Sequence, residues 1–519
     1  MSVSVIFLTV LSYIAGHTLS IIIPTAGFIG RWLNPHSFNS KEHLAIVVMA
    51  SSASGAAFAT EVLATQKLYY NVVPSPVVAI LLLLSSQLLG YGMAGVLRKS
   101  LVYPTKLLWP SILPLNSLIQ TLHRDKADMK FSFFWIIFGL TAVWELFPQY
   151  IMPVLTGVSI FCLAKRDSLV FTDIFGGTSG NEGLGLLSLC FDWQYITTSS
   201  LFLPLVTLTN AFVGFSICVA LFVSLYYGNV WRAQDFPFLS QQLFSQGSNS
   251  SRYVAYNQSA ILDERNELDP ALLEAVGLPF FTATNASYLL TTNLSVAATV
   301  VHVLLFNFKT VKDVFSPPKW ARSKTDSHYV ALTEEMTGLD PHYRQMLLYQ
   351  EVPSWWYILI GILSAVTGLA CTYILRSTLP WWGFIVACIL SFISTLFLGA
   401  MSGLIGFDVP ITSVIQLIGG YLHPGKPVAN MYFVLFGANS QSQAMLLIQN
   451  LKLGQYGKLS PQCTFTVQIL GTIFGAVINY VLMSSITTNQ RDILLSIQGT
   501  NIWSGQLIQS FNSNVSFNS

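Results

Sequence analysis

The sequence predicts an all-α, polytopic membrane protein with about ten to twelve transmembrane helices, some of them broken or re-entrant. Of its 519 residues, 53% are hydrophobic and only 9% are charged, whereas a soluble domain carries about 25% charged residues. Apolar runs of about 20 residues recur along the chain, which is the length needed to cross a bilayer. Glycine, proline and acidic residues interrupt several of these runs, as they do in the broken helices of membrane proteins.

The first third contains three predicted spans and one polar loop. Ser2–Pro24 is long enough to cross a membrane and lacks the basic start of a signal peptide, so a transmembrane helix is favoured. The polar loop Asn34–His43 follows. His43–Leu63 is rich in Ala, Ser and Gly, which lets helices approach closely and predicts an interior position. Val77–Val96 is the third span.

The next segments contain prolines and allow more than one interpretation. Leu101–Lys130 is basic and carries three prolines, which predicts a cytoplasmic hairpin or re-entrant piece. Phe131–Ala164 is too long for one helix of about 20 residues, and Pro148 and Pro153 interrupt it. It is either one broken helix or two short ones. Leu201–Tyr227 is a clear span.

Two long polar loops set the predicted topology of one transmembrane domain, 1–519. Residues 229–287 are acidic and carry glycosylation sequons, which predicts an extracellular loop. Residues 309–354 are basic, which predicts a cytoplasmic loop. The span Tyr288–Phe308 separates them, and the same count places the tail 487–519 outside. The candidate glycosylation sites are Asn249, Asn257, Asn285 and Asn514.

The last third contains five more predicted spans, one of them unusually polar, and two polar breaks. The spans are Trp355–Leu375, Trp381–Gly403, Asp408–Leu422 and Phe465–Ser485. A fifth span, Val428–Leu451, is unusually polar because it contains Asn439–Gln443. The breaks are Tyr421–Val428 and Leu451–Gln462.

The stretch Asn181–Ile196 carries the most informative acids. Glu182 and Asp192 lie in a short, glycine-interrupted segment between long apolar runs. A charge at the bilayer centre costs about 3 kcal/mol or more unless it faces a cavity or a partner. We therefore expect these two acids to serve a functional site.

The remaining motifs exclude several classes of chemistry. The six cysteines are scattered without a C-x-x-C pair, and no Walker loop, G-x-S-x-G or H-E-x-x-H is present. Net charge is only +2 without a basic block, so no nucleic-acid partner is indicated. We expect no enzyme activity, catalytic residue, cofactor or metal.

Several acids lie near or inside the apolar runs, and they indicate proton binding. A desolvated carboxyl group can take up and release a proton near neutral pH. Besides Glu182 and Asp192, the candidates are Glu61, Glu145 and Asp408. For Glu61, a position at the membrane interface fits equally well, and for Glu145 and Asp408 a helix cap or an interfacial position does.

Several of these stretches resemble signatures of the oligopeptide transporter family, the proton-coupled peptide carriers of fungi and plants. The similar stretches are Asn34–His43 (NPHSFNSKEH), Tyr150–Gly157 (YIMPVLTG), Asn181–Gly185 (NEGLG), Phe191–Ile196 (FDWQYI), Leu339–Tyr343, Glu351–Trp356 and Tyr421–Met431. The resemblance runs from about Asn34 to the end of the chain.

The resemblance implies a multi-pass secondary transporter of the plasma membrane. Such a protein would import small oligopeptides of about three to five residues, including glutathione-like ones, with protons, and its partners would be the peptide, protons and the lipid bilayer. Glu182 and Asp192 would contact protons or the substrate amine. The other expected substrate or proton contacts are Gln194, Tyr195, Asn34, Asn39, Glu42 and Lys458.

The sequence also departs from the family pattern. His36 stands where the first signature has glycine, and a signature at Asn450–Gln462 has lost its acid, its histidine, one proline and its final arginine. Family members extend beyond both ends of this sequence, so the chain resembles a shortened member. The alternatives are a carrier of metal chelates or siderophores from the same superfamily, and a transport-dead sensor or integral-membrane enzyme.

Overall fold

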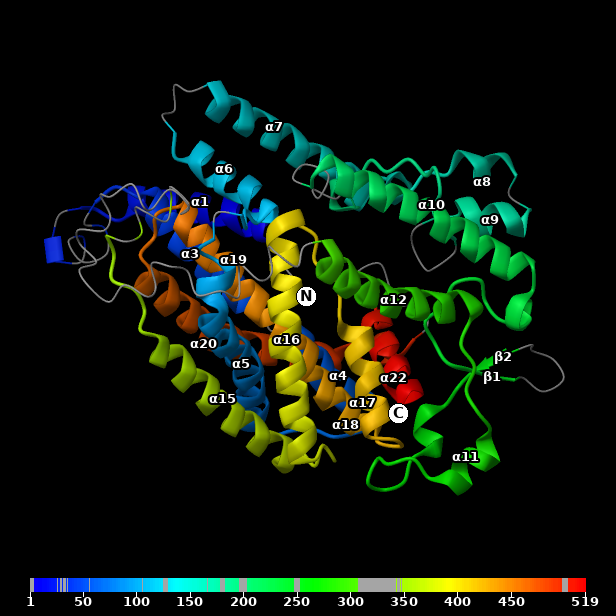
Figure 1. Cartoon of the computed structure of the whole chain (residues 1–519). Helices are drawn as coiled ribbons and strands as arrows, with labels where there is room; N and C mark the ends of the chain where they lie inside the picture. Colours follow the sequence, from blue (N-terminus) through cyan, green and yellow to red (C-terminus); the bar gives the residue numbers. More distant parts are fainter. Residues whose placement is uncertain are drawn as a thin grey trace. The chain divides into compact units, whose positions relative to one another are not determined.

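A computed structural model gives the fold of most of the chain. It describes all residues except 1–3, 26, 29, 31–33, 35, 56, 105, 125–128, 166, 178–182, 196–202, 247–252, 307–341, 343–345, 347 and 497–502. The predicted all-α class is confirmed, since helices make up nearly all regular structure among the described residues (Figure 1).

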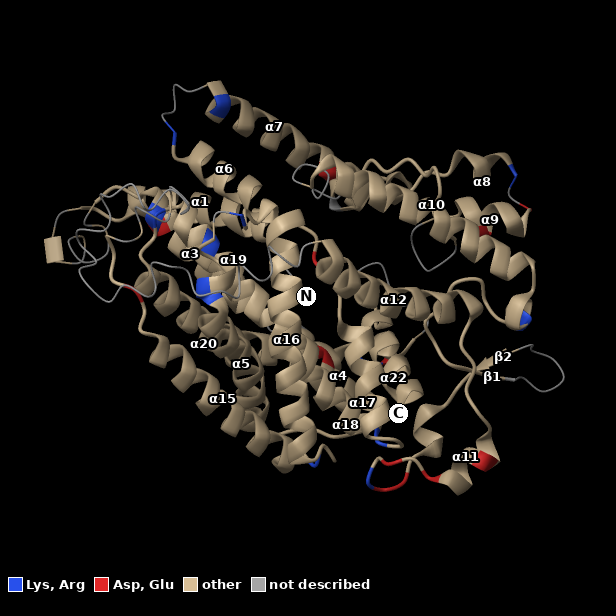
Figure 2. Ribbon diagram, in the orientation of Figure 1, with Lys and Arg blue, Asp and Glu red and all other residues tan. Residues whose placement is uncertain are grey.

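Nine helices in the described part of the chain are long and apolar enough to cross a membrane. They are α1 (Val5–Ile22), α3 and α4 together (Ser40–Ser54 and Ala57–Tyr69), α5 (Pro76–Leu101), α7 with its last turn (Met129–Ile151), α10 (Leu205–Tyr227), α12 (Ala283–Phe306), α15 (Ser354–Ile374), α16 (Trp381–Ile405) and α20 (Pro461–Asn489). Most Lys, Arg, Asp and Glu residues lie near helix ends or in connecting segments (Figure 2).

The shorter elements fill the breaks between these helices. They are α6 (Leu113–Leu122), α8 (Ile160–Ala164), α9 (Leu169–Phe175), β1 (Phe244–Gln246), β2 (Tyr253–Ala255), α11 (Pro270–Val276), α17 (Thr412–Leu422), α18 (Pro427–Val434), α19 (Ser440–Tyr456), α21 (Arg491–Leu495) and α22 (Gln506–Asn518). β1 and β2 form an antiparallel hairpin.

The chain divides into two compact units. The first, unit 1, comprises Met1–His123, Ser295–Arg491 and the last two residues. The second, unit 2, comprises Arg124–Leu294 and Asp492–Phe517.

In unit 1, α5 is the central helix. It packs along α15 and α19, and these three helices supply much of one buried apolar cluster (Figure 1). Glycines permit the closest approaches: Gly92 faces Gly361 of α15, and Gly95 lies against the ring of Tyr357. This explains why an apolar helix such as α5 also contains several small residues.

The C-terminal part of unit 1 contains a discontinuous helix pair. α17 is only 11 residues long and packs against α18. A π-helical turn, Leu435–Asn439, joins α18 to α19. The predicted span Asp408–Leu422 is therefore helical only from Thr412, and the predicted polar helix extends from Pro427 to Tyr456 across this turn.

Unit 2 resolves the ambiguous run Phe131–Ala164. α7 continues into a π-helical turn, Phe147–Ile151, which contains Pro148. A 3-10 turn starting at Pro153 and the short α8 follow. The run is thus one long helix followed by short pieces, because each proline removes a backbone donor. The predicted outer loop 229–287 contains the β-hairpin and α11, and most of the loop 309–354 lies outside the described residues.

We expect Gly92→Ala to destabilise unit 1. A Cβ at position 92 would lie 2.5 Å from the Cα of Gly361, which is backbone and cannot rotate away. Overpacking of this kind costs roughly 1–3 kcal/mol, so the melting temperature of the detergent-purified chain should fall.

Gly214→Ala is the matched control. Gly214 also lies within a long helix, α10, and a Cβ added at this position would have no neighbour within 4 Å. Because Ala is the better helix former by about 1 kcal/mol, this variant should melt at the same or a higher temperature. Equal stability of the two variants would contradict the close α5–α15 packing.

Candidate functional site: a polar pocket beside a broken helix

Unit 1 contains a pocket of about 390 Å³, within the range typical of small-molecule sites. The end of α16, the segment after it, the start of α17 and the first half of α19 form its walls. Its lining residues are Leu398, Asp408, Val409, Pro410, Ile411, Thr412, Gln441, Ser442, Gln443, Met445, Leu446 and Gln449. Half of these side chains are polar, although the surrounding helices are strongly apolar.

The segment after α16 positions Asp408. Gly406 caps α16 with φ of 75°, a left-handed conformation that glycine adopts without strain. The chain then turns back, so that the Ser402 hydroxyl donates a short hydrogen bond to the Asp408 carboxylate. Asp408 is exposed at the pocket, and its charge therefore needs no buried counter-ion.

Gln443 links the pocket to a break in another helix. Its amide nitrogen donates to the Gly55 carbonyl and to Asn439 Oδ1, the latter at 3.3 Å. Both partners accept, so the orientation of the amide is fixed. Its amide oxygen is buried and has no hydrogen-bond partner among the described residues.

The break lies between α3, which ends at Ser54, and α4, which begins at Ala57. The last carbonyl groups of a helix lack partners within that helix, and in hydrocarbon such groups must be satisfied by protein. Amides from α5, α20 and α19 each donate to one carbonyl at this break. The pairs are Gln87 with Ser52 at 2.8 Å, Asn479 with Ala53 at 2.8 Å, and Gln443 with Gly55.

A buried polar network extends from this break into the bundle. The Gln87 amide also donates to Tyr91 Oη at 3.0 Å, and Thr472 Oγ1 lies 3.3 Å from the same oxygen. Gln87 and Gln468 each carry amide atoms without a partner in the described part of the chain. Unpaired buried polar atoms are rare in proteins and commonly mark water or ligand positions.

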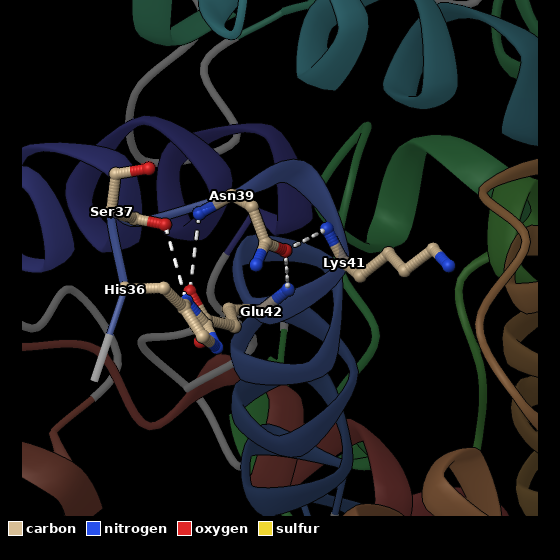
Figure 3. Close-up of polar contacts among 5 residues, drawn as sticks. All are labelled: His36, Ser37, Asn39, Lys41 and Glu42. Atoms are coloured by element: carbon tan, nitrogen blue, oxygen red, sulfur yellow. Dashed lines mark hydrogen bonds and ion pairs between the residues drawn. The ribbon is translucent and has the colours of Figure 1, made fainter. Parts of the chain in front are cut away.

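The loop Asn34–His43 has a clear structural role (Figure 3). Asn39 Oδ1 accepts from the backbone of Lys41 at 2.9 Å and of Glu42 at 3.1 Å. The backbone N–H of Asn39 donates in turn to a carboxylate oxygen of Glu42 at 3.1 Å. His36 Nδ1 lies 3.4 Å from the other Glu42 oxygen. Asn39 and Glu42 thus form a capping box at the start of α3.

Two further residues of this loop connect α1 to the rest of unit 1. Asn34 donates to the carbonyls of Ser20 at 3.0 Å and Ile23 at 2.7 Å, which completes the C-terminal end of α1. His43 is fully buried, with Nε2 2.8 Å from the Thr9 carbonyl. Since a carbonyl only accepts, His43 Nε2 carries the proton.

His43 Nδ1 therefore accepts from His123 Nε2 at 3.0 Å. Burial, with the neighbouring His43 and His17, lowers the pKa of His123 to about 4. His123 is therefore neutral at physiological pH, with its proton on Nε2, from which it donates to His43.

Unit 2 holds the predicted acid Asp192. Its side chain is buried, and Gln149 donates to its Oδ2 at 2.8 Å. The Glu145 carboxyl is within hydrogen-bonding reach of it. Gln194 and Tyr195 lie in a 3-10 turn directly after Asp192, and Tyr195 is exposed. Glu182 lies outside the described residues.

The predicted site residues that the structure describes in unit 1 do not line the pocket. Asn34, Asn39, Glu42 and Lys458 lie in unit 1 but are absent from its walls, and Lys458 is exposed just after α19. The polarity of Asn439–Gln443 was visible in the sequence, but no role followed from it. For Asp408, the sequence allowed either proton binding or a position at a helix cap or the membrane interface. The signal was a run of amides in an otherwise apolar helix.

The candidate glycosylation sites differ in accessibility. Asn257 is exposed in the loop after the hairpin. Asn285 is only 5% exposed within α12, which leaves no room for a glycan in this conformation. Asn514 is half-buried on α22. Asn249 lies outside the described residues.

We expect Gln443→Leu to destabilise the protein more than Gln449→Leu. The first change leaves the partly buried Gly55 carbonyl without its side-chain donor, which costs about 1–3 kcal/mol. Gln449 lines the same pocket on the same helix and makes no hydrogen bond that the described structure records. The measurement is the melting temperature of each purified full-length variant. Equal melting temperatures would contradict the assigned role of Gln443 at the break.

Comparison with known proteins places the chain in a family. Residues 1–517 match the family model described as OPT oligopeptide transporter protein. Oligopeptide transporter 1 of Arabidopsis thaliana is 33% identical over 483 residues, which are 89% of this chain and 61% of that protein. Oligopeptide transporter 6 is 32% identical over 484 residues, 89% of this chain and 62% of that protein. The chain thus spans less than two thirds of these two relatives. It belongs to the OPT oligopeptide transporter family of multi-pass membrane proteins.

Proposed function

We propose that this protein is a secondary transporter that imports small oligopeptides across the membrane together with protons. The observation that carries the proposal is the pocket of about 390 Å³ beside the α3–α4 break, inside a bundle of apolar helices. Broken helices that expose polar groups within the membrane are typical of substrate sites in secondary transporters. The family match supports the same conclusion.

The chemistry of the pocket suits a peptide. Gln441, Gln443 and Gln449 provide amide groups, each able to donate and accept hydrogen bonds, as a peptide backbone does. Leu398, Met445 and other apolar residues supply surface for side chains. We propose peptides of about three to five residues, including glutathione-like ones, and transport across the plasma membrane.

Asp192 is our candidate for proton binding. It is buried beside Glu145 and accepts from Gln149. Two adjacent carboxyl groups are suited to hold one exchangeable proton between them. We also propose that Glu182 contacts protons or the substrate amine. Further proposed contacts along the substrate path are Gln194, Tyr195, Asn34, Asn39, Glu42 and Lys458.

Uptake of a labelled tetrapeptide tests the proposed function. Cells expressing the 519-residue chain should accumulate the peptide faster at external pH 5 than at pH 7.5, because a proton gradient drives import. A protonophore should abolish the accumulation. Surface labelling must show that the protein reaches the membrane. Absence of uptake by a surface-expressed chain would contradict the proposal.

Asp192→Asn should abolish uptake at every pH while leaving the protein in the membrane. The change removes the ionisable group but keeps a side chain able to hydrogen-bond Gln149. Asp235→Asn is the control, since among the described residues Asp235 pairs with Arg232 alone, in an exposed ion pair that contributes little to stability. Normal uptake by Asp192→Asn across the pH range would exclude Asp192 from proton coupling.

A further inference from the structure

We propose that the pocket recognises the free amino terminus of a peptide, with the ammonium group at the Asp408 carboxylate and a peptide N–H at the Gln443 amide oxygen. The inference rests on the proposed function for its substrate class, a small peptide. It adds which end of the peptide is bound and which atoms bind it.

The first argument is charge. Asp408 is the only charged residue among the described residues that line the pocket. A single carboxylate without a neighbouring base in the wall attracts a cation and repels a carboxylate. A peptide offers one cationic group that every sequence shares, its terminal ammonium. Its other terminus would bring a second negative charge toward Asp408.

The helix ends at the pocket contribute smaller fields. Asp408 follows the C-terminal end of α16, whose free carbonyls favour a cation. The N-terminus of α17, at Thr412, favours an anion. Each helix end acts as about half an elementary charge, so the two fields oppose one another. The full charge of Asp408 therefore decides the preference of the pocket.

The second argument is the hydrogen-bonding capacity of the walls. Asp408 receives a hydrogen bond from Ser402, yet a carboxylate has about four acceptor positions. Gln443 is only 4% exposed, and both of its amide protons point to the Gly55 carbonyl and Asn439. Its oxygen lacks a donor in the described structure. Both groups can thus accept a further hydrogen bond from a ligand.

An amino-terminal dipeptide unit supplies such donors. Its ammonium group carries three N–H bonds, and the following peptide bond carries one more. A carboxyl-terminal unit presents mainly acceptors. We therefore expect that acetylation of the amino terminus weakens recognition strongly, because it removes the charge, whereas amidation of the carboxyl terminus changes recognition little.

The test compares three forms of tetra-alanine on the full chain: free, N-acetylated and C-amidated. Uptake is measured in cells, and binding is measured as thermal stabilisation of the purified protein. The N-acetylated form should lose about tenfold or more in apparent affinity, corresponding to about 1.4 kcal/mol. The C-amidated form should stay within about twofold of the free peptide.

Asp408→Asn should reduce affinity for the free peptide to that for the N-acetylated form, and so erase the discrimination. Asp408→Glu keeps the charge and should retain it. Glu274→Gln is the control, because Glu274 is an exposed carboxylate on α11 in unit 2. If Asp408→Asn fails to fold, the wild-type comparison of the three peptides still decides.

The outcomes separate this inference from the proposed function. Equal uptake of free and N-acetylated peptide would overturn the inference and leave the transporter intact. Stabilisation by free but not by N-acetylated peptide, without uptake, would support the inference and contradict transport. Neither uptake nor stabilisation by the free peptide would overturn both.

Discussion

The structure of unit 1 depends on satisfying the backbone carbonyls where α3 gives way to α4. Each polar group left unpaired in an apolar interior costs several kcal/mol. Gln87, Asn479 and Gln443 meet this requirement, and they come from three different helices. The break at Gly55 thus fixes how α5, α19 and α20 are arranged around it. Apolar contacts alone are not directional and would not fix the rotation of each helix about its axis.

The side chains that satisfy these carbonyls also place polar atoms without hydrogen-bond partners inside the helix bundle. An amide side chain that donates to a carbonyl also carries an acceptor oxygen, and a crowded break cannot satisfy every such atom. The oxygens of Gln87 and Gln443 have no partner among the described residues. Gln443 also lines the pocket, so the residue that holds the break together also forms part of the pocket wall. In our proposal, Gln443 therefore serves both helix packing and substrate recognition.

The helices could be predicted from sequence because membrane insertion is a local, one-dimensional constraint: a run such as Pro76–Leu101 is recognisable by its length and apolarity. Pro148 likewise indicated in the sequence where the regular part of α7 ends. The pocket could not be predicted, since Asp408 and Gln443 meet only after the chain turns back through α17 and α18. Asn39 and Glu42 carried a second signal: an N-x-x-E pattern before an apolar run is the signature of a capping box, so their structural role at the start of α3 could also have been predicted from the sequence.

Three backbone irregularities lie around the pocket, and together they explain why it faces polar groups. The α3–α4 break offers the Gly55 carbonyl, the left-handed Gly406 turns the chain so that Asp408 lies beside Ser402, and the π-helical turn Leu435–Asn439 precedes Gln441 and Gln443. One extra residue in a helix rotates everything after it by about 100°. Without this turn, the side chains of α19 would present a different face to the pocket. Regular helices alone bury their polar backbone completely, so a polar site inside an apolar bundle requires irregular backbone of this kind.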